Sequence, residues 1–397
     1  EIHERLVGSE MCIRDRPYTT KVLSIKESMS IARTAKATVI ANVLADLDEV
    51  INGNYLPTSY DADNKGRITR WAAMAIKAKI YLFEGNWTQV KNITSTIMTE
   101  GGFKLFGSYA GLFEIANEYN SEVILDAQYR PTSREHQMMY VFLPPTLGGY
   151  SQLSPLQELV DSYIMLDGKT IKETGTSFDE SHPYANRDPR LKATVMYTGN
   201  SYTLADGTEV VINCEKGEGK DGYGVGSDCS ATGYYIKKYW DNTYRATLYS
   251  GLNPILIRYA DILLMNAEAL AELGELDKTA WDATIKPIRD RAGFTLASAL
   301  EFPEGASKDK LIEIVRNERR SELALEGHRH KDIIRWRIAD NVLNGWCHGL
   351  KTNDVVGTDD GYVRVENRTF NANRHYLWPI PQAERDLNGN LEQNPNW

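Results

Sequence analysis

Two distant segments of the chain share one pattern, and it constrains the fold more than any other feature of the sequence. Residues 78–87 read AKIYLFEGNW and residues 267–276 read AEALAELGEL; in each, a glycine follows an alanine by seven positions and a large apolar residue stands two positions later. A small residue lets neighbouring helices approach closely, and a glycine closes the turn between them. The pattern therefore predicts a chain built from helical hairpins.

Apolar residues recur at helical spacing through the first part of the chain. Residues 38–56 carry them three and four positions apart, and Gly53 and Pro57 end the pattern. We expect two further helices at residues 68–85 and 87–99. These helices and the two matching hairpins are typical of tetratricopeptide-type repeats, so the expected fold class is mainly α.

The centre of the chain, residues 131–250, has a different character. Gly, Pro, Asn and Asp punctuate it, and only short runs such as 192–197 (KATVMY) and 209–213 (EVVIN) indicate strands. Long irregular segments on a rigid scaffold usually build binding sites, although a tolerated surface insertion is the alternative. We expect one intertwined domain with a helical part at 17–130, this loop-rich ligand-binding region, and a second helical part at 251–397.

Net charge and hydropathy exclude several classes of partner. The formal net charge is −9, which argues against nucleic acid, because phosphate binding needs lysine and arginine clustered on a basic face. No apolar run approaches the ~18 residues that a membrane-spanning helix needs. No signal-peptide pattern is visible either.

The four cysteines stand at positions 12, 214, 229 and 347. They form no CxxC pair, so a zinc site is not expected and no cofactor is indicated. Cys214 and Cys229 flank a glycine-rich loop and could form a disulfide in an oxidising compartment. The sequence leaves that pairing, and any calcium binding, open.

Residues 318–336 (ERRSELALEGHRHKDIIRW) gather many ionisable side chains on a helical segment. Glu318 and Glu322 could serve as a general acid and base, and His328 with His330 could bind a metal. The arginines around the two glutamates would keep both ionised, and no third metal ligand is suitably spaced. We therefore interpret the segment as scaffolding, with neither a catalytic nor a metal site.

A second helix carries a polar stripe that complements this segment. The run from 258 to 273 is apolar nearly all round, which marks it as buried, but Asp261 and Glu268 fall on one stripe. An unpaired buried charge would cost several kcal/mol. We therefore expect Asp261 or Glu268 to pair with Arg319 or Arg320.

Several segments together resemble the SusD/RagB family of outer-membrane nutrient-binding lipoproteins. They read LIRYADILLMNAEAL, ERRSELALEGHRHKDIIRW, HYLWPIPQAERDLNGNLEQNPNW, ADLDEVI, GRITRWAAMAIKAKIYLFEGNW and NRDPRL, and they follow the family's order from Pro17 to Trp397. The resemblance implies a SusD-like α-helical fold, with four tetratricopeptide-like helix pairs supporting an irregular ligand-binding region. It also implies a protein without enzymatic activity that captures glycans or other nutrients at the cell surface and caps a TonB-dependent, SusC-like transporter.

The beginning of the chain departs from that family. Family members start with a lipoprotein signal, an anchoring cysteine and a first helical repeat, and none of these is found here. Residues 1–16 match nothing in the family and look like a translated sequencing-adapter remnant, so we expect a non-native or disordered leader and assign no anchoring role to Cys12. A lipid anchor on the outer membrane is expected in a missing N-terminal part.

Aromatic residues in the loop-rich centre are the candidate ligand contacts. The chain has 22 tyrosines and eight tryptophans but nine phenylalanines, which favours rings that carry a hydrogen-bonding edge. A sugar receptor needs an exposed ring with polar groups beside it. We single out Trp240 with its neighbour Asn242, Tyr223 in a glycine-rich loop, and Tyr150; for each ring, packing on the scaffold is the alternative.

Two other classes of protein compete with a nutrient-binding protein. A helical glycoside hydrolase would need two carboxylates facing each other at roughly 5 to 10 Å across an aromatic cleft, and no isolated acid pair is visible. A helical-repeat protein-interaction scaffold would continue its repeats through the centre of the chain, which is loop-rich instead. The sequence does not identify the ligand.

Overall fold

The computed structural model describes residues 17–204, 206–244 and 246–397. The longer helices are α4 (Lys36–Asn52), α5 (Arg70–Phe83), α6 (Trp87–Glu100), α10 (Tyr259–Leu273), α12 (Ile285–Ala292), α14 (Lys308–Glu322) and α15 (Arg329–Arg335). The shorter helices are α3 (Ile25–Ser28), α7 (Met138–Phe142), α8 (Gln157–Val160), α9 (Pro189–Thr194), α11 (Lys278–Ala283), α13 (Ala297–Leu300), α16 (Ala339–Val342) and α17 (Gln382–Leu387).

The strands form four small antiparallel sheets. They are β1 (Val123–Asp126) with β6 (Ile255–Arg258), β2 (Val195–Met196) with β5 (Tyr235–Ile236), β3 (Ser201–Thr203) with β4 (Glu209–Val211), and β7 (Gly345–Lys351) with β9 (Tyr362–Arg368) and β8 (Thr358–Asp359). In the first sheet Val123 lies opposite Arg258. The chain therefore enters the loop-rich centre after β1 and returns from it at β6, and these two paired strands lie side by side.

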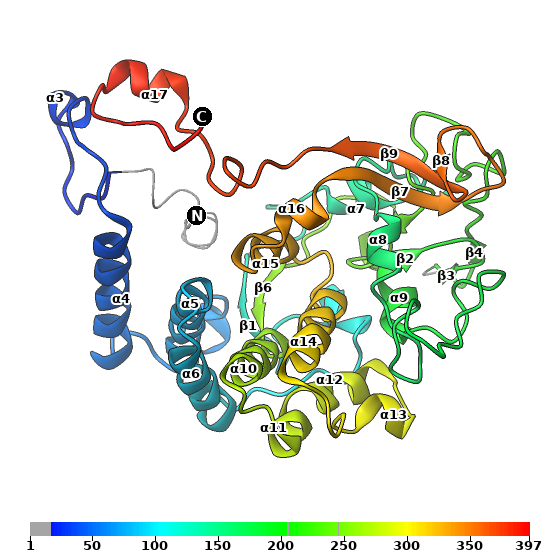
Figure 1. Cartoon of the computed structure of the whole chain (residues 1–397), viewed down its shortest axis with the longest axis horizontal. Helices are drawn as coiled ribbons and strands as arrows, with labels where there is room; N and C mark the ends of the chain where they lie inside the picture. The colour runs from blue at the N-terminus through cyan, green and yellow to red at the C-terminus, as the bar shows by residue number, and fades with distance from the viewer. Residues whose placement is uncertain (1–16, 205, 245) are drawn as a thin grey trace.

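The predicted helical hairpins are confirmed. Gly85, between α5 and α6, and Gly274, between α10 and α11, have φ angles of 67° and 73°, the left-handed conformation that ends a helix. The side chain of Thr69 accepts a hydrogen bond from the Ala72 amide and starts α5. α10 packs against α5, α6 and α14, which surround it in Figure 1.

Some predicted boundaries are wrong, for local reasons. α4 ends at Asn52 rather than 56, because Gly53 follows it directly. The strand expected at 192–197 is helical up to Thr194: Asp188 caps α9 and Pro189 occupies its first turn, which favours a helix start. Only Val195 and Met196 form β2, whereas the strand expected at 209–213 is present as β4 but ends at Val211.

The loop-rich centre has an apolar core of its own. Tyr163, Tyr234 and Tyr235 are almost fully buried in it, together with leucines and methionines from α7, α9 and the following loops. Burial of large tyrosine side chains stabilises a region that has little regular secondary structure. Much of the tyrosine excess thus belongs to the core and not to a ligand site.

The three cysteines that the structure describes are free thiols. Cys214 and Cys347 are buried, and the Sγ of Cys229 donates a hydrogen bond to the carbonyl oxygen of Lys220. The possible disulfide between Cys214 and Cys229 is therefore not formed. Cys12 and the expected leader, residues 1–16, lie outside the described residues.

A network of buried ion pairs joins the helices to the loop-rich centre. Arg258, the last residue of β6, contacts the carboxylates of Glu122 (2.7 Å) and Glu322 (2.6 Å). It also reaches Glu326 (2.8 Å), and Arg190 of α9 reaches Glu322 (2.9 Å). Burial alone would raise the pKa of Glu322, but the surrounding arginines lower it well below its usual range.

The predicted pairing of the polar stripes is confirmed. A guanidinium nitrogen of Arg319 lies 2.6 Å from the carboxylate of Asp261. Glu268 pairs instead with Arg335 (2.6 Å) of α15. Arg320 donates a hydrogen bond to the backbone carbonyl oxygen of Glu158. These contacts agree with a scaffolding role for residues 318–336.

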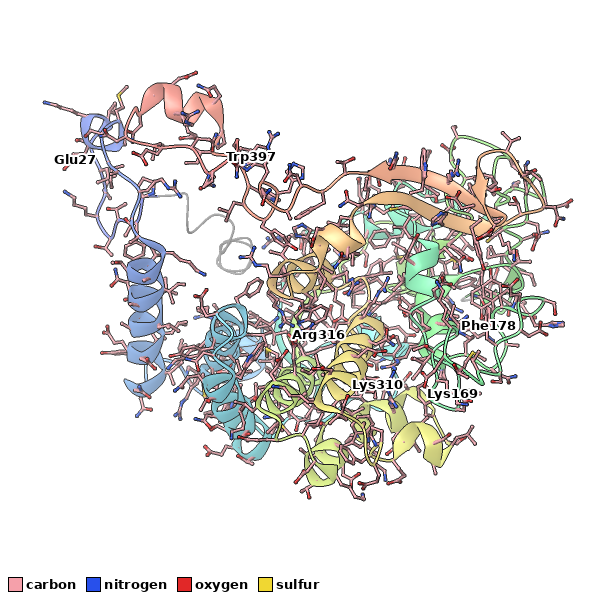
Figure 2. All side chains as sticks on the ribbon, viewed as in Figure 1. Glu27, Lys169, Phe178, Lys310, Arg316 and Trp397 are labelled. Atoms are coloured by element: carbon pink, nitrogen blue, oxygen red, sulfur yellow. The ribbon has the colours of Figure 1, made fainter. Side chains whose placement is uncertain are left out.

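The two ends of the described chain hold each other. The side-chain amide of Asn388 donates hydrogen bonds to the carbonyl oxygens of Ser28 (3.2 Å) and Ile31 (2.8 Å). α3 and α17 consequently lie together at one side of the molecule (Figure 1), and Glu27 and Trp397 mark this arm in Figure 2.

His348 of β7 connects the three-stranded sheet to α8. Its ring nitrogens lie 2.8 Å from the carboxylate of Glu158 and 3.0 Å from that of Asp359. Partial burial would lower the pKa of His348, but the hydrogen bonds with both carboxylates outweigh it and the net shift is upward.

The raised pKa of His348 predicts a pH-dependent stability. A folded pKa above the unfolded value of about 6.5 stabilises the fold below that pH, and the gain is lost as pH rises through the folded pKa. We expect His348→Gln to remove this component, roughly 1 kcal/mol or less because the pairs are partly exposed. Thermal melts of both proteins from acidic to mildly alkaline pH measure it. Equal pH profiles for parent and variant would contradict the prediction, and His182→Gln, at an exposed pair with Asp179, is the control.

Candidate functional site

Trp240 lies half-buried and not freely exposed. Its ring packs edge-on against Tyr202, with ring centroids 5.3 Å apart and an interplanar angle of 69°. The side chain of the next residue, Asp241, accepts hydrogen bonds from the amides of Ile115 (2.7 Å) and Thr243 (2.9 Å). The turn that carries Trp240 is thus fixed to the body of the molecule.

Asn242 and Tyr223 are also partly engaged in the structure. The amide nitrogen of Asn242 donates a hydrogen bond to the carbonyl oxygen of Thr203 (2.6 Å). Tyr223 is half-buried, and its backbone amide donates to the carbonyl oxygen of Cys214 (3.2 Å). Within the described residues, neither Asn242 nor Tyr223 makes a contact with Tyr150.

Tyr150 stacks on a second tyrosine at the surface. It is 41% exposed, and its ring lies 4.3 Å from that of Tyr140 at an interplanar angle of 30°. A hydrogen bond with Tyr150 raises the pKa of Tyr140, and Tyr249 and Asp228 are close enough to raise it further. Tyr249 is 44% exposed. We call Tyr140, Tyr150 and Tyr249 the tyrosine platform.

A tight turn positions Tyr150 on Tyr140. Gly148 takes a left-handed φ of 84°, which glycine adopts without strain. At Gly149 a side chain would collide with the carbonyl oxygen of Leu143, so the backbone passes where only glycine fits. The amide of Tyr150 then donates to the carbonyl oxygen of Tyr140 (2.9 Å).

Sequence reasoning found one member of the tyrosine platform and missed two. Tyr140 belongs to α7 and Tyr249 to a loop about a hundred residues later, so no local pattern connects them to Tyr150. The signal that was available is the Gly148-Gly149 pair, which marks a sharp turn that places the following residue at the surface.

The chemistry of the tyrosine platform suits a ligand with apolar faces and hydroxyl groups. Stacked rings offer a flat apolar surface, and their phenol groups donate and accept hydrogen bonds at its edge. Asp228 adds an exposed carboxylate that accepts hydrogen bonds from hydroxyl groups. A sugar ring, with its C–H face and its rim of hydroxyls, meets both requirements.

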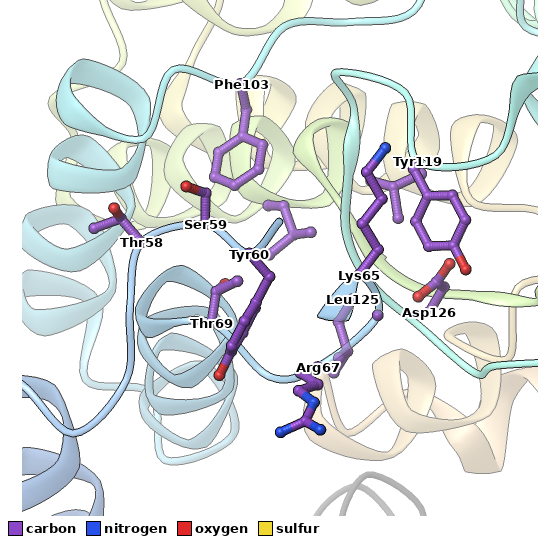
Figure 3. Close-up of a pocket in the computed structure, with 13 residues that line it drawn as sticks. Thr58, Ser59, Tyr60, Lys65, Arg67, Thr69, Phe103, Tyr119, Leu125 and Asp126 are labelled. Carbon is purple, nitrogen blue, oxygen red and sulfur yellow. The ribbon is translucent and has the colours of Figure 1, made fainter. Parts of the chain in front are cut away.

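A separate hollow of about 210 Å³ lies beside the start of α5 (Figure 3). Tyr60, Lys65 and Tyr119 line it, but the ammonium group of Lys65 lies over the ring of Tyr119, 5.4 Å from its centroid. The carboxylate of Asp126 in its wall accepts hydrogen bonds from Gln128 (2.6 Å) and Asn253 (3.1 Å). The carboxylate of Asp126 is therefore already engaged by the protein itself.

The histidines singled out in the sequence lie in a basic environment. Burial and the nearby charge of Lys79 hold the pKa of His328 well below its usual range, and its Nδ1 faces the guanidinium of Arg319 (3.4 Å). Within the described ranges, no three His, Cys, Asp or Glu side chains converge as metal ligands. In the same residues, no helix is long and apolar enough to cross a membrane.

Comparison with known proteins identifies the family. The model of the SusD family matches residues 112–397 of this chain. The chain belongs to the SusD family, and its helix-rich fold is the fold of that family.

Curated relatives and solved structures agree with this membership. A SusD-like protein of Formosa agariphila is 28% identical over 353 residues, which cover 83% of this chain and 61% of the relative. A second one from the same organism is 26% identical over 392 residues, 96% of this chain and 69% of the relative. The chain thus spans less than two thirds of the first relative and slightly more of the second.

The crystal structure of a SusD-like carbohydrate-binding protein from Bacteroides fragilis is similar throughout. It is 28% identical, with a TM-score of 0.85 over 98% of this chain and 78% of that one. Another SusD-like protein from Bacteroides fragilis, also 28% identical, has a TM-score of 0.80 over 98% of this chain and 77% of that one. The described fold is thus shared along nearly the whole chain.

Proposed function

We propose that this protein binds oligosaccharides without catalysis, at the tyrosine platform, and delivers them to a TonB-dependent, SusC-like transporter in the outer membrane. The observation that carries the proposal is the stack of the exposed Tyr150, which follows a turn that only glycine permits, on the half-buried Tyr140 of α7. The similarity to a carbohydrate-binding protein of the same family supports it.

The contacts of Glu318 and Glu322 argue against these two acids as a hydrolytic pair. A glycoside hydrolase needs a carboxylic acid that is protonated near neutral pH and a second carboxylate across a cleft. Glu318 and Glu322, the acid pair of the sequence, are buried against arginines, which hold the pKa of both below its usual range although burial opposes this. These two groups are thus kept ionised and out of reach of a substrate.

Trp240, Tyr223 and Asn242 stand as second-rank contacts in this proposal. Each is half-buried and already packed or hydrogen-bonded within the protein. These three residues would contact only a part of the ligand that lies at the edge of the loop-rich centre. We place the main stacking contact at Tyr150 because its ring is both exposed and held in place.

Alanine substitution tests the tyrosine platform. We expect Tyr140→Ala and Tyr150→Ala each to weaken oligosaccharide binding by about 1.5 kcal/mol, or roughly tenfold in Kd, because each removes a stacking surface. Calorimetric titration of a panel of neutral oligosaccharides measures the change. Tyr55→Ala, at a tyrosine that is 66% exposed elsewhere, is the matched control.

Three results would contradict the proposal, two for binding and one for delivery. Unchanged affinity in both platform variants, with intact folding, would move the site elsewhere. Steady release of products from the same oligosaccharides would favour the hydrolase alternative. For the delivery step, the full-length protein is purified from a membrane extract that holds the intact SusC-like transporter. Recovery of the protein as a lone monomer from that extract would count against delivery.

A further inference from the structure

A cavity of about 310 Å³ lies beside the end of the charged helix α14, where Arg319 and Arg320 line it. Residues 154–159, which run into α8, the end of α14, the start of α15 and the first half of β7 enclose it. Arg320 and Arg329 line this cavity and also the wider hollow behind it, which is lined by α14 and Trp336. Two guanidinium groups therefore stand where the two spaces meet.

Neither arginine has a carboxylate partner among the residues that the structure describes. Arg320 donates one hydrogen bond, to the backbone carbonyl oxygen of Glu158. The neighbouring arginines of α14 are different: Arg319 binds Asp261 (2.6 Å) and Arg316 binds Glu272 (3.0 Å). Burial and the nearby charge of Arg329 lower the pKa of Arg320 to about 10, and burial lowers the pKa of Arg329. An arginine side chain nevertheless stays cationic at neutral pH.

Glu158 and Asp161 attract Arg320, and Asp332 attracts Arg329, but none of these carboxylates forms an ion pair with either arginine in the described structure. Asp332 binds Arg319 (2.9 Å) and Arg335 (2.9 Å) on its two oxygens. Glu158 accepts hydrogen bonds from the ring and the backbone amide of His348. Two cations held close together repel each other, and an anion bound directly between them lowers that cost.

The rest of the cavity wall is largely apolar. Leu323 and Ile333 are buried in it, and Val342 and Trp346 are 40% and 42% exposed at its rim. A volume near 300 Å³ is at the lower end for ligand pockets and suits a small molecule. The site thus combines an anion-binding pair with an apolar surface that includes an indole ring.

We propose that this cavity binds an anionic sugar unit, with its carboxylate or sulfate held by Arg320 and Arg329 and its C–H face against Val342 and Trp346. Guanidinium groups bind both anions through paired hydrogen bonds. The choice of a sugar rests on the proposed function, whereas the requirement for an anion rests on the arginines alone. The cavity is distinct from the tyrosine platform, with which it shares no lining residue.

Three small probes test this site by calorimetric titration of the whole chain: sodium D-glucuronate, D-glucose 6-sulfate and D-glucose. We expect the two anions to bind, glucose not to bind, and the affinity to fall as sodium chloride is added. Which anion binds more tightly identifies the natural group. Equal binding of glucuronate, glucose 6-sulfate and glucose would overturn the proposal.

Charge-removing variants locate the binding. We expect Arg320→Gln and Arg329→Gln each to weaken binding of the anionic probe at least tenfold. The guanidinium group of Arg329 makes no hydrogen bond or ion pair with the described residues, so the Arg329→Gln variant reports on the cavity even if Arg320→Gln fails to fold. Arg67→Gln removes one exposed positive charge beside α5 and is the matched control.

The outcomes separate this site from the tyrosine platform. Loss of glucuronate binding in Arg329→Gln, with neutral oligosaccharide binding intact, supports a second site. Unchanged glucuronate affinity in Arg329→Gln, or a loss in Tyr150→Ala instead, overturns it. If no neutral oligosaccharide binds at all, the proposed function is refuted. The anion-binding proposal is then decided by the titrations with glucuronate and glucose 6-sulfate alone.

Discussion

Replacing Arg258 by alanine is expected to destabilise the fold by roughly 3 to 5 kcal/mol, the range found when one partner of a buried ion pair is removed. The guanidinium group contacts three carboxylates, those of Glu122, Glu322 and Glu326, and all four side chains are almost completely buried. Without Arg258, these carboxylates stay in the interior with less positive charge around them. Urea-induced unfolding of parent and variant measures the loss.

A surface ion pair provides the control for this experiment. Arg364 lies beside Asp359 with both side chains more than a third exposed, so solvent screens the interaction. Arg364→Ala is expected to unfold at nearly the same urea concentration as the parent. Equal unfolding of Arg258→Ala and Arg364→Ala would show that the buried network contributes nothing to stability.

The ion pairs show how far the sequence could predict this interior. The stripe of Asp261 and Glu268 was visible from helical spacing alone, and so was the need for a basic partner. The choice of partner was not, because Arg335 approaches Glu268 from another helix, α15. Arg320 differs from Arg319 by one position, about 100° around the helix; both line the cavity, but Arg319 reaches Asp261 whereas Arg320 forms no ion pair with a carboxylate of the described residues.

The candidate site shows a stricter limit. Trp240 looked exposed from its polar neighbours, but Tyr202, far away in sequence, covers its edge. Tyr150 was identified from its glycines, whereas Tyr140 and Tyr249 joined it only through the folded loops. Short-range patterns predict turns and helices; the neighbours of a ring are set by tertiary packing.

The buried network also explains how an irregular region can hold a binding surface still. Arg190 of α9 binds Glu318 (2.7 Å) of α14, and Lys238, next to β5, binds Glu326 (2.7 Å). Both basic residues belong to the loop-rich centre and both acids to the helical scaffold. Ordered binding groups lose less conformational entropy when a ligand arrives, which favours affinity.

Gly149→Ala is expected to weaken oligosaccharide binding as much as Tyr150→Ala does, about tenfold in Kd, although every aromatic ring is retained. An added methyl group would collide with the backbone carbonyl of Leu143, and backbone atoms cannot rotate aside as a side chain does. The loop must shift, and Tyr150 moves off Tyr140. Calorimetric titration of the same neutral oligosaccharides measures the effect.

Gly107→Ala is the matched control, because no atom lies within 4 Å of a methyl group at that exposed glycine. We expect Gly149→Ala also to lower stability by roughly 1 to 3 kcal/mol, as overpacking does. If Gly149→Ala binds as tightly as the parent, the fixed turn is not what presents Tyr150. If Tyr150→Ala nevertheless weakens binding, Tyr150 contacts the ligand without needing its stack on Tyr140. In that case the shifted loop still brings the ring to the ligand.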